Sequence, residues 1–313
     1  MNAISHAIAL YSRIALKSYE KVFVAYLLIT AVLSLIAYER LDNWYVIVLN
    51  HLLLVAAVYA IHSIPAQGKP LLRIFKDFYI FLYFPFLFKE LSSLSRALFP
   101  YYLEPFLIAS DRLFFGLFQE VFTTLHGNKL VNEFMAFSYG LYYILVPGIG
   151  IYLYIKRPFG QFEAFAYRFV ATMFFCYFLF ILIPVRGPHH SAFQANPQAL
   201  EGYVFFNLIG LLQKYGSTVG AAFPSSHVAG TWIAFFTLRR LNEKLYYLLL
   251  PLMVSLTISV FYLRYHYVLD ALGGYLVALG LNIHFLKQEQ DERIEQILLK
   301  RRSALPLSAR MKS

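Results

Sequence analysis

Apolar stretches separated by short polar segments dominate the pattern of this 313-residue chain. Most are close to the 20 or so residues that a helix needs to cross the hydrocarbon core of a bilayer. The stretches lie at residues 22–38, 44–62, 74–96, 131–155, 164–185, 226–240, 245–263 and 266–286. The pattern therefore predicts an all-α, polytopic integral membrane helix bundle with six to eight transmembrane helices.

Two stretches and one connecting segment depart from this pattern. Lys89 and Glu90 interrupt stretch 74–96, either as a structural ion pair at the interface or as groups that face a substrate, and Pro85 should bend it. Stretch 226–240 is short and begins with polar residues, so it should pack against protein. Segment 97–130 mixes prolines, charges and aromatic side chains. Since irregular backbone cannot face lipid, we expect an interfacial or re-entrant helix there.

Composition supports the membrane assignment and excludes other classes. The chain is 59% hydrophobic and only 14% charged, and a water-soluble domain of this size would need far more polar surface. The net charge of +10 could suggest a nucleic-acid partner, but the basic residues are scattered between apolar stretches and do not form one face. We therefore predict no nucleic-acid binding. The single cysteine, Cys176, cannot form an intrachain disulfide.

The distribution of basic residues predicts the orientation. Most of the 27 Lys and Arg residues fall on the cytoplasmic side if both termini are cytoplasmic. The expected organisation is an N-terminal interfacial segment (1–21), a transmembrane domain (22–286) and a basic cytoplasmic tail (287–313). Residues 186–227 and 264–270 then lie together at the non-cytoplasmic face.

Two short polar motifs lie on that face, at residues 223–227 (FPSSH) and 264–266 (RYH). Asp270 follows His266 by four residues, so on a helix the two share a face. A carboxylate there can fix the imidazole tautomer and leave Nε2 free as a nucleophile. His227 could then protonate the departing oxygen as general acid. We predict a catalytic group of His266, His227 and Asp270.

A phosphoryl group also needs donors around its oxygens. Ser225 and Ser226 open a helix after a proline, where free N–H groups and the helix dipole favour an anion, although a serine here could simply cap the helix. The predicted phosphate-binding residues are Ser225, Ser226, Arg186, Arg264 and His189, with His190 and Lys214 as weaker candidates. A histidine and a carboxylate at this spacing could instead bind zinc. No third ligand has suitable spacing, so we predict no metal.

These residues resemble the type 2 phosphatidic acid phosphatase superfamily. Residues 223–227 match its Pro-Ser-x-His signature, and residues 262–270 match the signature that carries its nucleophilic histidine and orienting aspartate. Residues 184–189 occupy the place of its first, phosphate-binding signature. Residues 111–116 and 133–143 are most similar to the branch that contains fungal inositol phosphorylceramide synthase. The resemblance covers roughly residues 75–286.

The chain departs from the family pattern at the phosphate ligands. Leu179 stands where the first signature has a lysine, and Gly187 separates Arg186 from the following proline. Val260 stands where the third signature usually has an arginine. Arg186 and Arg264 are therefore inferred from their chemistry, whereas the histidines, Ser225 and Asp270 match directly.

The resemblance implies a cofactor-free membrane enzyme that works through a phosphohistidine. The expected function is transfer of a phosphoryl or phospho-headgroup from a phospholipid or other lipid phosphate to a polyol or lipid alcohol. A lipid phosphatase using water, which acts on phosphatidate, polyprenyl or sphingoid phosphate, is the first alternative. A non-catalytic lipid-binding or transport relative is the second. In each case the bilayer is the expected environment.

Overall fold

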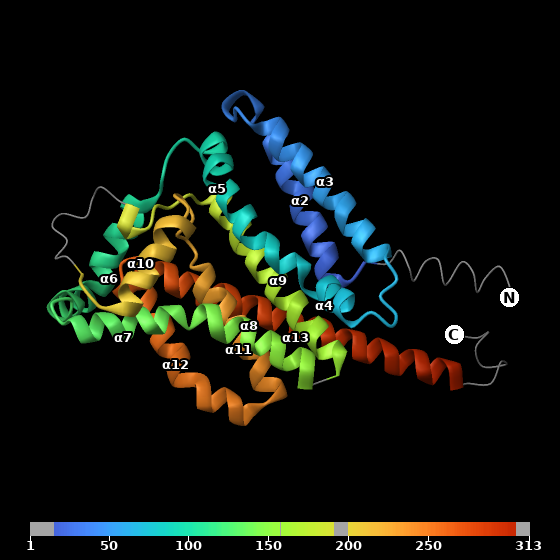
Figure 1. The fold of residues 1–313 in the computed structure, drawn as a ribbon. Helices are drawn as coiled ribbons and strands as arrows, with labels where there is room; N and C mark the ends of the chain where they lie inside the picture. Colours follow the sequence, from blue (N-terminus) through green and yellow to red (C-terminus); the bar gives the residue numbers. More distant parts are fainter. Residues whose placement is uncertain (1–15, 157, 191–199, 305–313) are drawn as a thin grey trace.

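The fold is an all-α bundle, as predicted. The computed structural model describes residues 16–156, 158–190 and 200–304 (Figure 1). It is 83% helical, and the described residues contain no β-strand. Six helical segments are long and apolar enough to cross a membrane: Ser18–Ile36, Trp44–Ser63, Lys129–Lys156, Phe159–Leu182, Glu243–Tyr262 and Val268–Ile294. The protein is therefore a multi-pass membrane protein.

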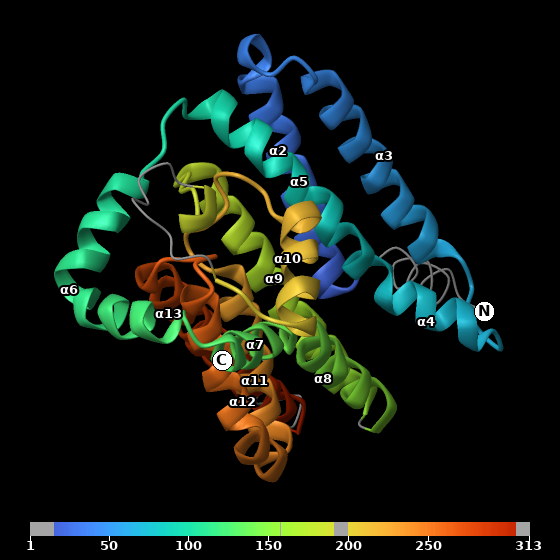
Figure 2. The same ribbon diagram turned by 60° about the vertical axis from the view of Figure 1, so that its left-hand side comes forward.

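The first two helices form a hairpin at one side of the bundle. Helices α2 (Ser18–Ile36) and α3 (Trp44–Ser63) are joined by the short 3-10 helix η1 (Tyr38–Arg40), and the hairpin lies on the opposite side from α12 in both views (Figures 1 and 2). α2 packs on α9, where the Tyr26 and Phe174 rings stack with centroids 4.3 Å apart. Most of the predicted N-terminal interfacial segment lies outside the described residues.

The third predicted stretch is not one continuous helix. It is divided into α4 (Pro70–Phe78), the 3-10 helix η2 (Tyr79–Tyr83) and α5 (Phe84–Leu98). Pro85 lies in the first turn of α5, where a missing N–H breaks no helical hydrogen bond. The proline therefore starts a new helix.

The middle of the chain also contains a break that the sequence pattern did not predict. Stretch 131–155 is split at Leu141 into α7 (Lys129–Gly140) and α8 (Tyr142–Lys156). The side chain of Asn128 caps α7 by accepting hydrogen bonds from the N–H groups of Leu130 and Val131. Segment 97–130 contains α6 (Glu104–Leu125), which is not among the candidate membrane spans.

The core of the bundle surrounds α9 (Phe159–Leu182), which packs against α2, α5, α8, α11 and α13. α11 (Ser226–Leu241) is short but largely buried among α9, α12 (Glu243–Tyr262) and α13, as its polar start predicts. α10 (Val204–Gly216) packs on α7, and the short 3-10 helix η3 covers Pro188–His190. α13 (Val268–Ala304) continues through the predicted start of the tail at residue 287 without a break. The tail beyond residue 304 lies outside the described residues.

Candidate active site

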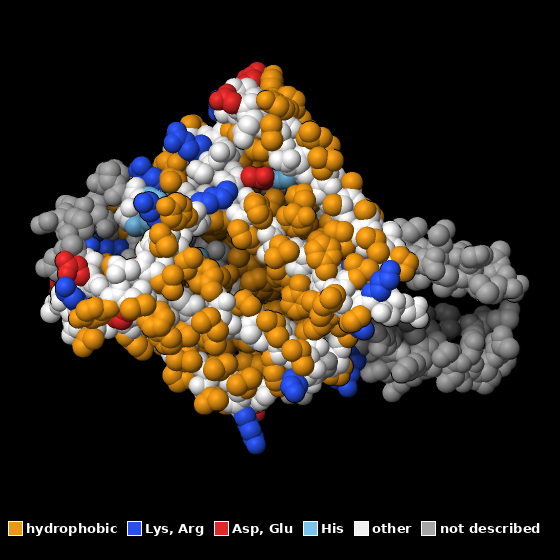
Figure 3. Space-filling model, viewed as in Figure 1, with side chains coloured by type: hydrophobic (Ala, Val, Ile, Leu, Met, Phe, Trp, Pro, Cys, Tyr) orange, Lys and Arg blue, Asp and Glu red, His pale blue; other side chains and the backbone are white. Residues whose placement is uncertain are grey.

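The two sequence motifs meet at one cavity of about 460 Å³. It lies between α5, α8, α9 and α10, and in Figure 3 the surface is hollowed among hydrophobic side chains between α5 and α8. The polar side chains of its lining are Tyr139, Tyr142, Tyr143, Tyr177, His189, Gln213, Ser217, Thr218, Ser226, His227, Tyr265 and His266. The rest of the lining is mostly aromatic and aliphatic.

The two motifs are fixed to each other through the backbone. The Ser225 N–H donates to the Asp270 carbonyl oxygen over 2.9 Å. A Cβ at Gly274 would overlap the Ser225 carbonyl oxygen, so only glycine allows α11 and α13 to approach this closely. These contacts hold the two histidines close together, with 6.1 Å between the ring centroids of His227 and His266.

His266 is held in one tautomer. Its Nδ1 lies 3.0 Å from the Ala222 carbonyl oxygen, which can only accept, so Nδ1 carries the proton. The same nitrogen lies 3.4 Å from Oδ2 of Asp270. Nε2 has no hydrogen-bond partner among the described residues, and the ring lines the cavity. The arrangement leaves Nε2 as the unprotonated nitrogen.

Asp270 is completely buried, and its two carboxylate oxygens have different surroundings. Its Oδ2 accepts a hydrogen bond from the Tyr267 N–H over 2.8 Å, which caps the start of α13. Its Oδ1 has no hydrogen-bond partner among the described residues. Because buried carboxylate oxygens are costly without a partner, this carboxylate depends on the Tyr267 N–H and on the His266 imidazole, whose Nδ1 lies 3.4 Å away.

His227 is positioned by residues to which the sequence assigned no function. Its Nε2 lies 3.0 Å from the Tyr139 hydroxyl, which accepts a hydrogen bond from Gln213 over 2.5 Å. The Tyr142 ring packs beside it with centroids 4.5 Å apart. Tyr139 was part of the family resemblance, but no local pattern places it beside a histidine 88 residues later.

The α11 N-terminus opens on the cavity. Ser225 is the N-cap, and its buried Oγ accepts from the Val228 N–H at 3.4 Å, so this serine holds the helix start and does not line the cavity. Ser226, the first residue of α11, does line it. The helix N-terminus therefore offers an anion site beside His227.

The two predicted arginine ligands point to other partners. Arg186 donates from Nε to Glu104 over 2.5 Å, and its guanidinium lies 4.7 Å from the centre of the Tyr102 ring. Arg264 has φ of 62° and contacts Nδ1 of His126 through Nη2 at 2.9 Å. Neither arginine lines the cavity, and the described lining contains no Lys or Arg. Burial and the Arg264 charge lower the pKa of His126 to about 4, so this contact joins a cation to a neutral ring.

His189 lines the cavity but carries no charge at neutral pH. Burial, followed by the fields of His190 and His266, lowers the pKa of His189 to about 3. Its ring lies 3.9 Å from the His190 ring and 5.4 Å from the Tyr265 ring, measured between centroids. His189 can donate a hydrogen bond to a phosphoryl oxygen but cannot neutralise it.

Lys89 and Glu90 do not pair with each other. Lys89 Nζ donates to the carbonyl oxygen of Ser217, a residue of the cavity lining, over 2.7 Å. Glu90 lies 2.8 Å from Nε2 of the buried His51. Glu90 thus ties α5 to the α2–α3 hairpin, whereas Lys89 reaches the edge of the cavity.

Asp111 is a further residue to which the sequence assigned no function. Its carboxylate in α6 accepts hydrogen bonds from the N–H groups of Val268 and Leu269 over 2.9 and 3.1 Å. These are the first residues of α13, so Asp111 caps the helix that carries Asp270. No group of three or more His, Cys, Asp or Glu side chains in the described ranges is arranged to hold a metal ion.

Comparison with known proteins gives one match. The family model described as the PAP2 superfamily matches residues 105–283, which include His227, His266 and Asp270. No curated protein and no solved structure matches the chain. The matched stretch is more than half of the sequence and includes the site described above. This chain therefore belongs to the PAP2 superfamily.

Proposed function

We propose that this protein transfers a phosphoryl or phospho-headgroup from a lipid to an alcohol through a phosphohistidine on His266. Membership of the PAP2 superfamily gives the coarser activity, that of a lipid phosphatase or phosphotransferase acting within a membrane. The proposal adds the nucleophile, the acceptor and the non-cytoplasmic location of the site.

One observation carries the proposal. The Ala222 carbonyl and Asp270 hold Nδ1 of His266, and this leaves Nε2 free beside a second histidine in the same cavity. An unprotonated imidazole nitrogen with its other side held by a carboxylate is a nucleophile.

The two histidines account for the bond changes and the proton transfers of both half-reactions. His266 Nε2 attacks phosphorus, the bond from phosphorus to the leaving oxygen breaks, and His227 gives that oxygen its proton. In the second half, an alcohol attacks the phosphohistidine, His227 takes the alcohol proton, and the P–N bond breaks. Asp270 stabilises the positive charge that His266 acquires while it carries the phosphoryl group.

Phosphoryl oxygens would be bound by the α11 N-terminus and by Ser226 at the cavity wall. His189 would add a neutral hydrogen-bond donor. For Arg186 or Arg264 to join them, each would have to exchange its present partner, Glu104 or His126. Ser225 would support the site indirectly, by holding the start of α11.

Hydroxyl groups around His227 favour an alcohol acceptor over water. Tyr139, Tyr142, Tyr143 and Gln213 line the cavity around this ring and could hydrogen-bond a polyol. Because they lie beside the proposed general acid and base, an alcohol bound there would be placed for the second half-reaction. Inositol is the polyol suggested by the branch resemblance.

The test uses purified protein with labelled lipid phosphates, with and without inositol or diacylglycerol. We expect transfer to the added alcohol, an acid-labile phosphoprotein, and loss of both in His266→Ala. His284→Ala, the same change at an exposed position of α13, is the matched control. Substantial turnover by His266→Ala would refute the nucleophile. Release of free phosphate at the same rate with or without alcohol would replace transfer by hydrolysis.

A further inference from the structure

The cavity extends far beyond the histidines. α9 contributes Phe162, Phe165, Phe169, Met173 and Tyr177 to its lining. Their spacing of three or four residues places them on one face of the helix. From the first to the last, α9 rises by about 22 Å at about 1.5 Å per residue. α5 and α8 complete an apolar groove along this face.

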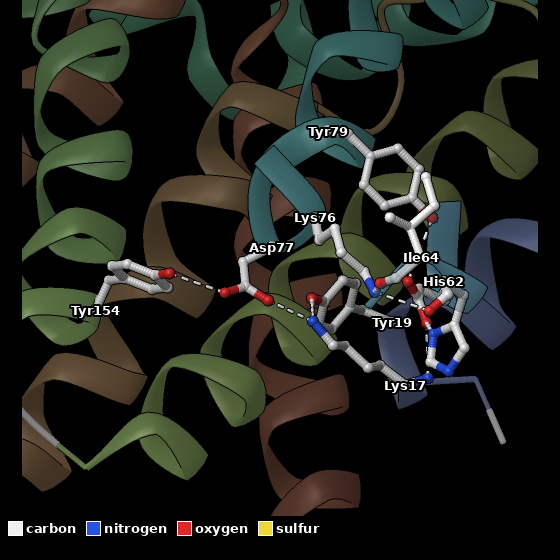
Figure 4. A network of polar contacts seen from close by, with 9 residues as sticks. Lys17, Tyr19, His62, Ile64, Lys76, Asp77, Tyr79 and Tyr154 are labelled. Carbon is white, nitrogen blue, oxygen red and sulfur yellow. Dashed lines mark hydrogen bonds and ion pairs between the residues drawn. The ribbon is translucent and has the colours of Figure 1, made fainter. Parts of the chain in front are cut away.

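A polar network lies at the far end of the groove, and every charged side chain in it has a partner. Phe78, which lines the groove, packs against Phe162 and Tyr154 with ring centroids 4.9 and 5.1 Å apart. Next to it, Asp77 accepts a hydrogen bond from the Tyr154 hydroxyl over 2.8 Å and pairs with Lys17 (Figure 4). The groove therefore has a reactive end at the histidines and a closed end at this network.

The length of the groove has a consequence for the substrate. A bilayer core is about 30 Å thick, so one leaflet supplies about 15 Å of hydrocarbon depth. Met173 contacts Tyr142 beside His227, and from Met173 to Phe162 α9 rises by about 16 Å. The groove then continues to Phe78, whose ring centroid lies 4.9 Å from that of Phe162, so the part of the groove below the histidines is longer than one leaflet. A chain whose phosphate lies at the histidines would have to pass the bilayer midplane to fill it.

We propose that the groove holds a single hydrocarbon chain of the lipid phosphate and selects chains longer than one leaflet, such as polyprenyl or very long alkyl chains. This inference rests on the proposed function, because it places the phosphate at His227 and His266. The continuity of one cavity from those histidines to Phe78 supports it. Burial of each further methylene group in the aromatic lining would add affinity.

Gly150 offers a way to block the groove midway. It lines the groove from α8, eight residues or about 12 Å after Tyr142 at the reactive end. A Cβ there would lie 2.9 Å from Cε1 of Phe165 on the opposite wall. A larger side chain would therefore fill the groove at this depth and leave the histidine end unchanged.

The experiment compares Gly150→Leu with wild type on hexyl, hexadecyl and polyprenyl phosphates. In wild type we expect kcat/KM to rise along this series. In Gly150→Leu, turnover of hexyl phosphate should fall least, because its chain ends before Gly150. The longer substrates should lose about tenfold or more, since the exclusion of a few methylene groups is worth that much. Gly150→Leu/Phe165→Ala should restore long-chain turnover.

Gly148→Leu is the matched control. Gly148 lies two residues earlier on α8, is exposed, and has no atom within 4 Å of an added Cβ. It should leave the chain-length dependence unchanged. A wild type without chain-length preference, or an equal loss for all chain lengths in folded Gly150→Leu, would overturn the proposal.

A second readout separates this inference from the catalytic proposal. Thermal stabilisation by the same alkyl phosphates is measured in His266→Ala and in His266→Ala/Gly150→Leu. Stabilisation that grows with chain length, and is cut off by Gly150→Leu, supports the groove even if no lipid phosphate is turned over. Stabilisation independent of chain length overturns the groove even if turnover is found.

Discussion

The two ends of the apolar groove are both polar, but they differ in how far their ionisable side chains are paired. At the closed end, Lys17 pairs with Asp77, and His62 lies 2.8 Å from Glu20. At the reactive end, Oδ1 of Asp270 and Oγ1 of Thr218 are buried without a hydrogen-bond partner among the described residues. Buried polar groups are normally paired, so the difference indicates a structural network at one end and a site completed by a ligand at the other.

Substitutions at the closed end should therefore lower the free energy of unfolding, whereas substitutions at the reactive end should lower turnover. Removing one partner of a satisfied buried pair leaves the other charge uncompensated and destabilises the fold. Changing a group in an incompletely satisfied site removes an interaction that matters mainly when substrate is bound.

The largest effect is expected for Asp270→Asn. Asparagine keeps an oxygen that can accept from the Tyr267 N–H but loses the charge beside His266. By analogy with catalytic triads, turnover should fall by about 10³–10⁴-fold. The melting temperature should change little. Initial transfer rates and thermal unfolding are measured together, and a rate within tenfold of wild type would contradict the assigned function of the carboxylate.

The second-largest effect is expected for Lys17→Met, at the closed end of the groove. Asp77 is only 3% exposed, and without Lys17 its carboxylate keeps the Tyr154 hydroxyl but loses its ion pair. The free energy of unfolding should fall by about 3 kcal/mol, the low end for a broken buried pair, because Lys17 is itself one-fifth exposed.

Turnover per folded molecule should stay unchanged in Lys17→Met. Lys21→Met, at an exposed position one turn further along α2, is the control and should not alter stability measurably. Equal stability of the two variants would show that the Asp77 network does not hold the closed end.

The same contrast explains what the sequence could predict. The bundle and the two motifs follow from local patterns, namely apolar length and the spacing of His266 and Asp270. The structure brings those motifs together, with 6.1 Å between the histidine ring centroids. The helices and the His266–Asp270 spacing depend only on residues that are neighbours in the sequence. The placement of the two motifs on one side depends on which membrane face each segment reaches.

Partners distant in sequence could not be predicted in this way. Arg186 has a positive charge that suits phosphate, but in the structure it donates a hydrogen bond to Glu104, 82 residues earlier. Arg264 contacts His126, which is 138 residues away, and Asp111 caps α13 from another helix. Charge alone identifies what a side chain could bind. Helix packing decides which partner is within reach.

A smaller effect is expected for Tyr139→Phe. The change removes the hydroxyl that contacts His227 and leaves Gln213 without that acceptor. One hydrogen bond is worth about 0.5–1.5 kcal/mol, so kcat should fall by about two- to tenfold. Tyr247→Phe, the same change at an exposed position of α12 outside the cavity lining, is the control. Equal kcat values for the two variants would exclude Tyr139 as a positioning residue.

The smallest effect is expected for Lys89→Met. Lys89 and Lys17 lie near opposite ends of the groove and differ in their partners. Lys17 at the closed end is neutralised by a carboxylate. Lys89 donates to a carbonyl oxygen at the cavity edge and has no carboxylate partner among the described residues, since its neighbour Glu90 is bound by His51. A positive charge without an opposite partner beside a cavity attracts an anionic headgroup, but an exposed charge contributes only about 0.2–1 kcal/mol. KM should therefore rise by about two- to fivefold at constant kcat, and added salt should reduce the difference. Lys214→Met, on α10, is the control, because the Lys214 ammonium lies over the Tyr215 ring. If Lys89→Met lowers stability and leaves KM unchanged, Lys89 belongs with Lys17 among the structural lysines.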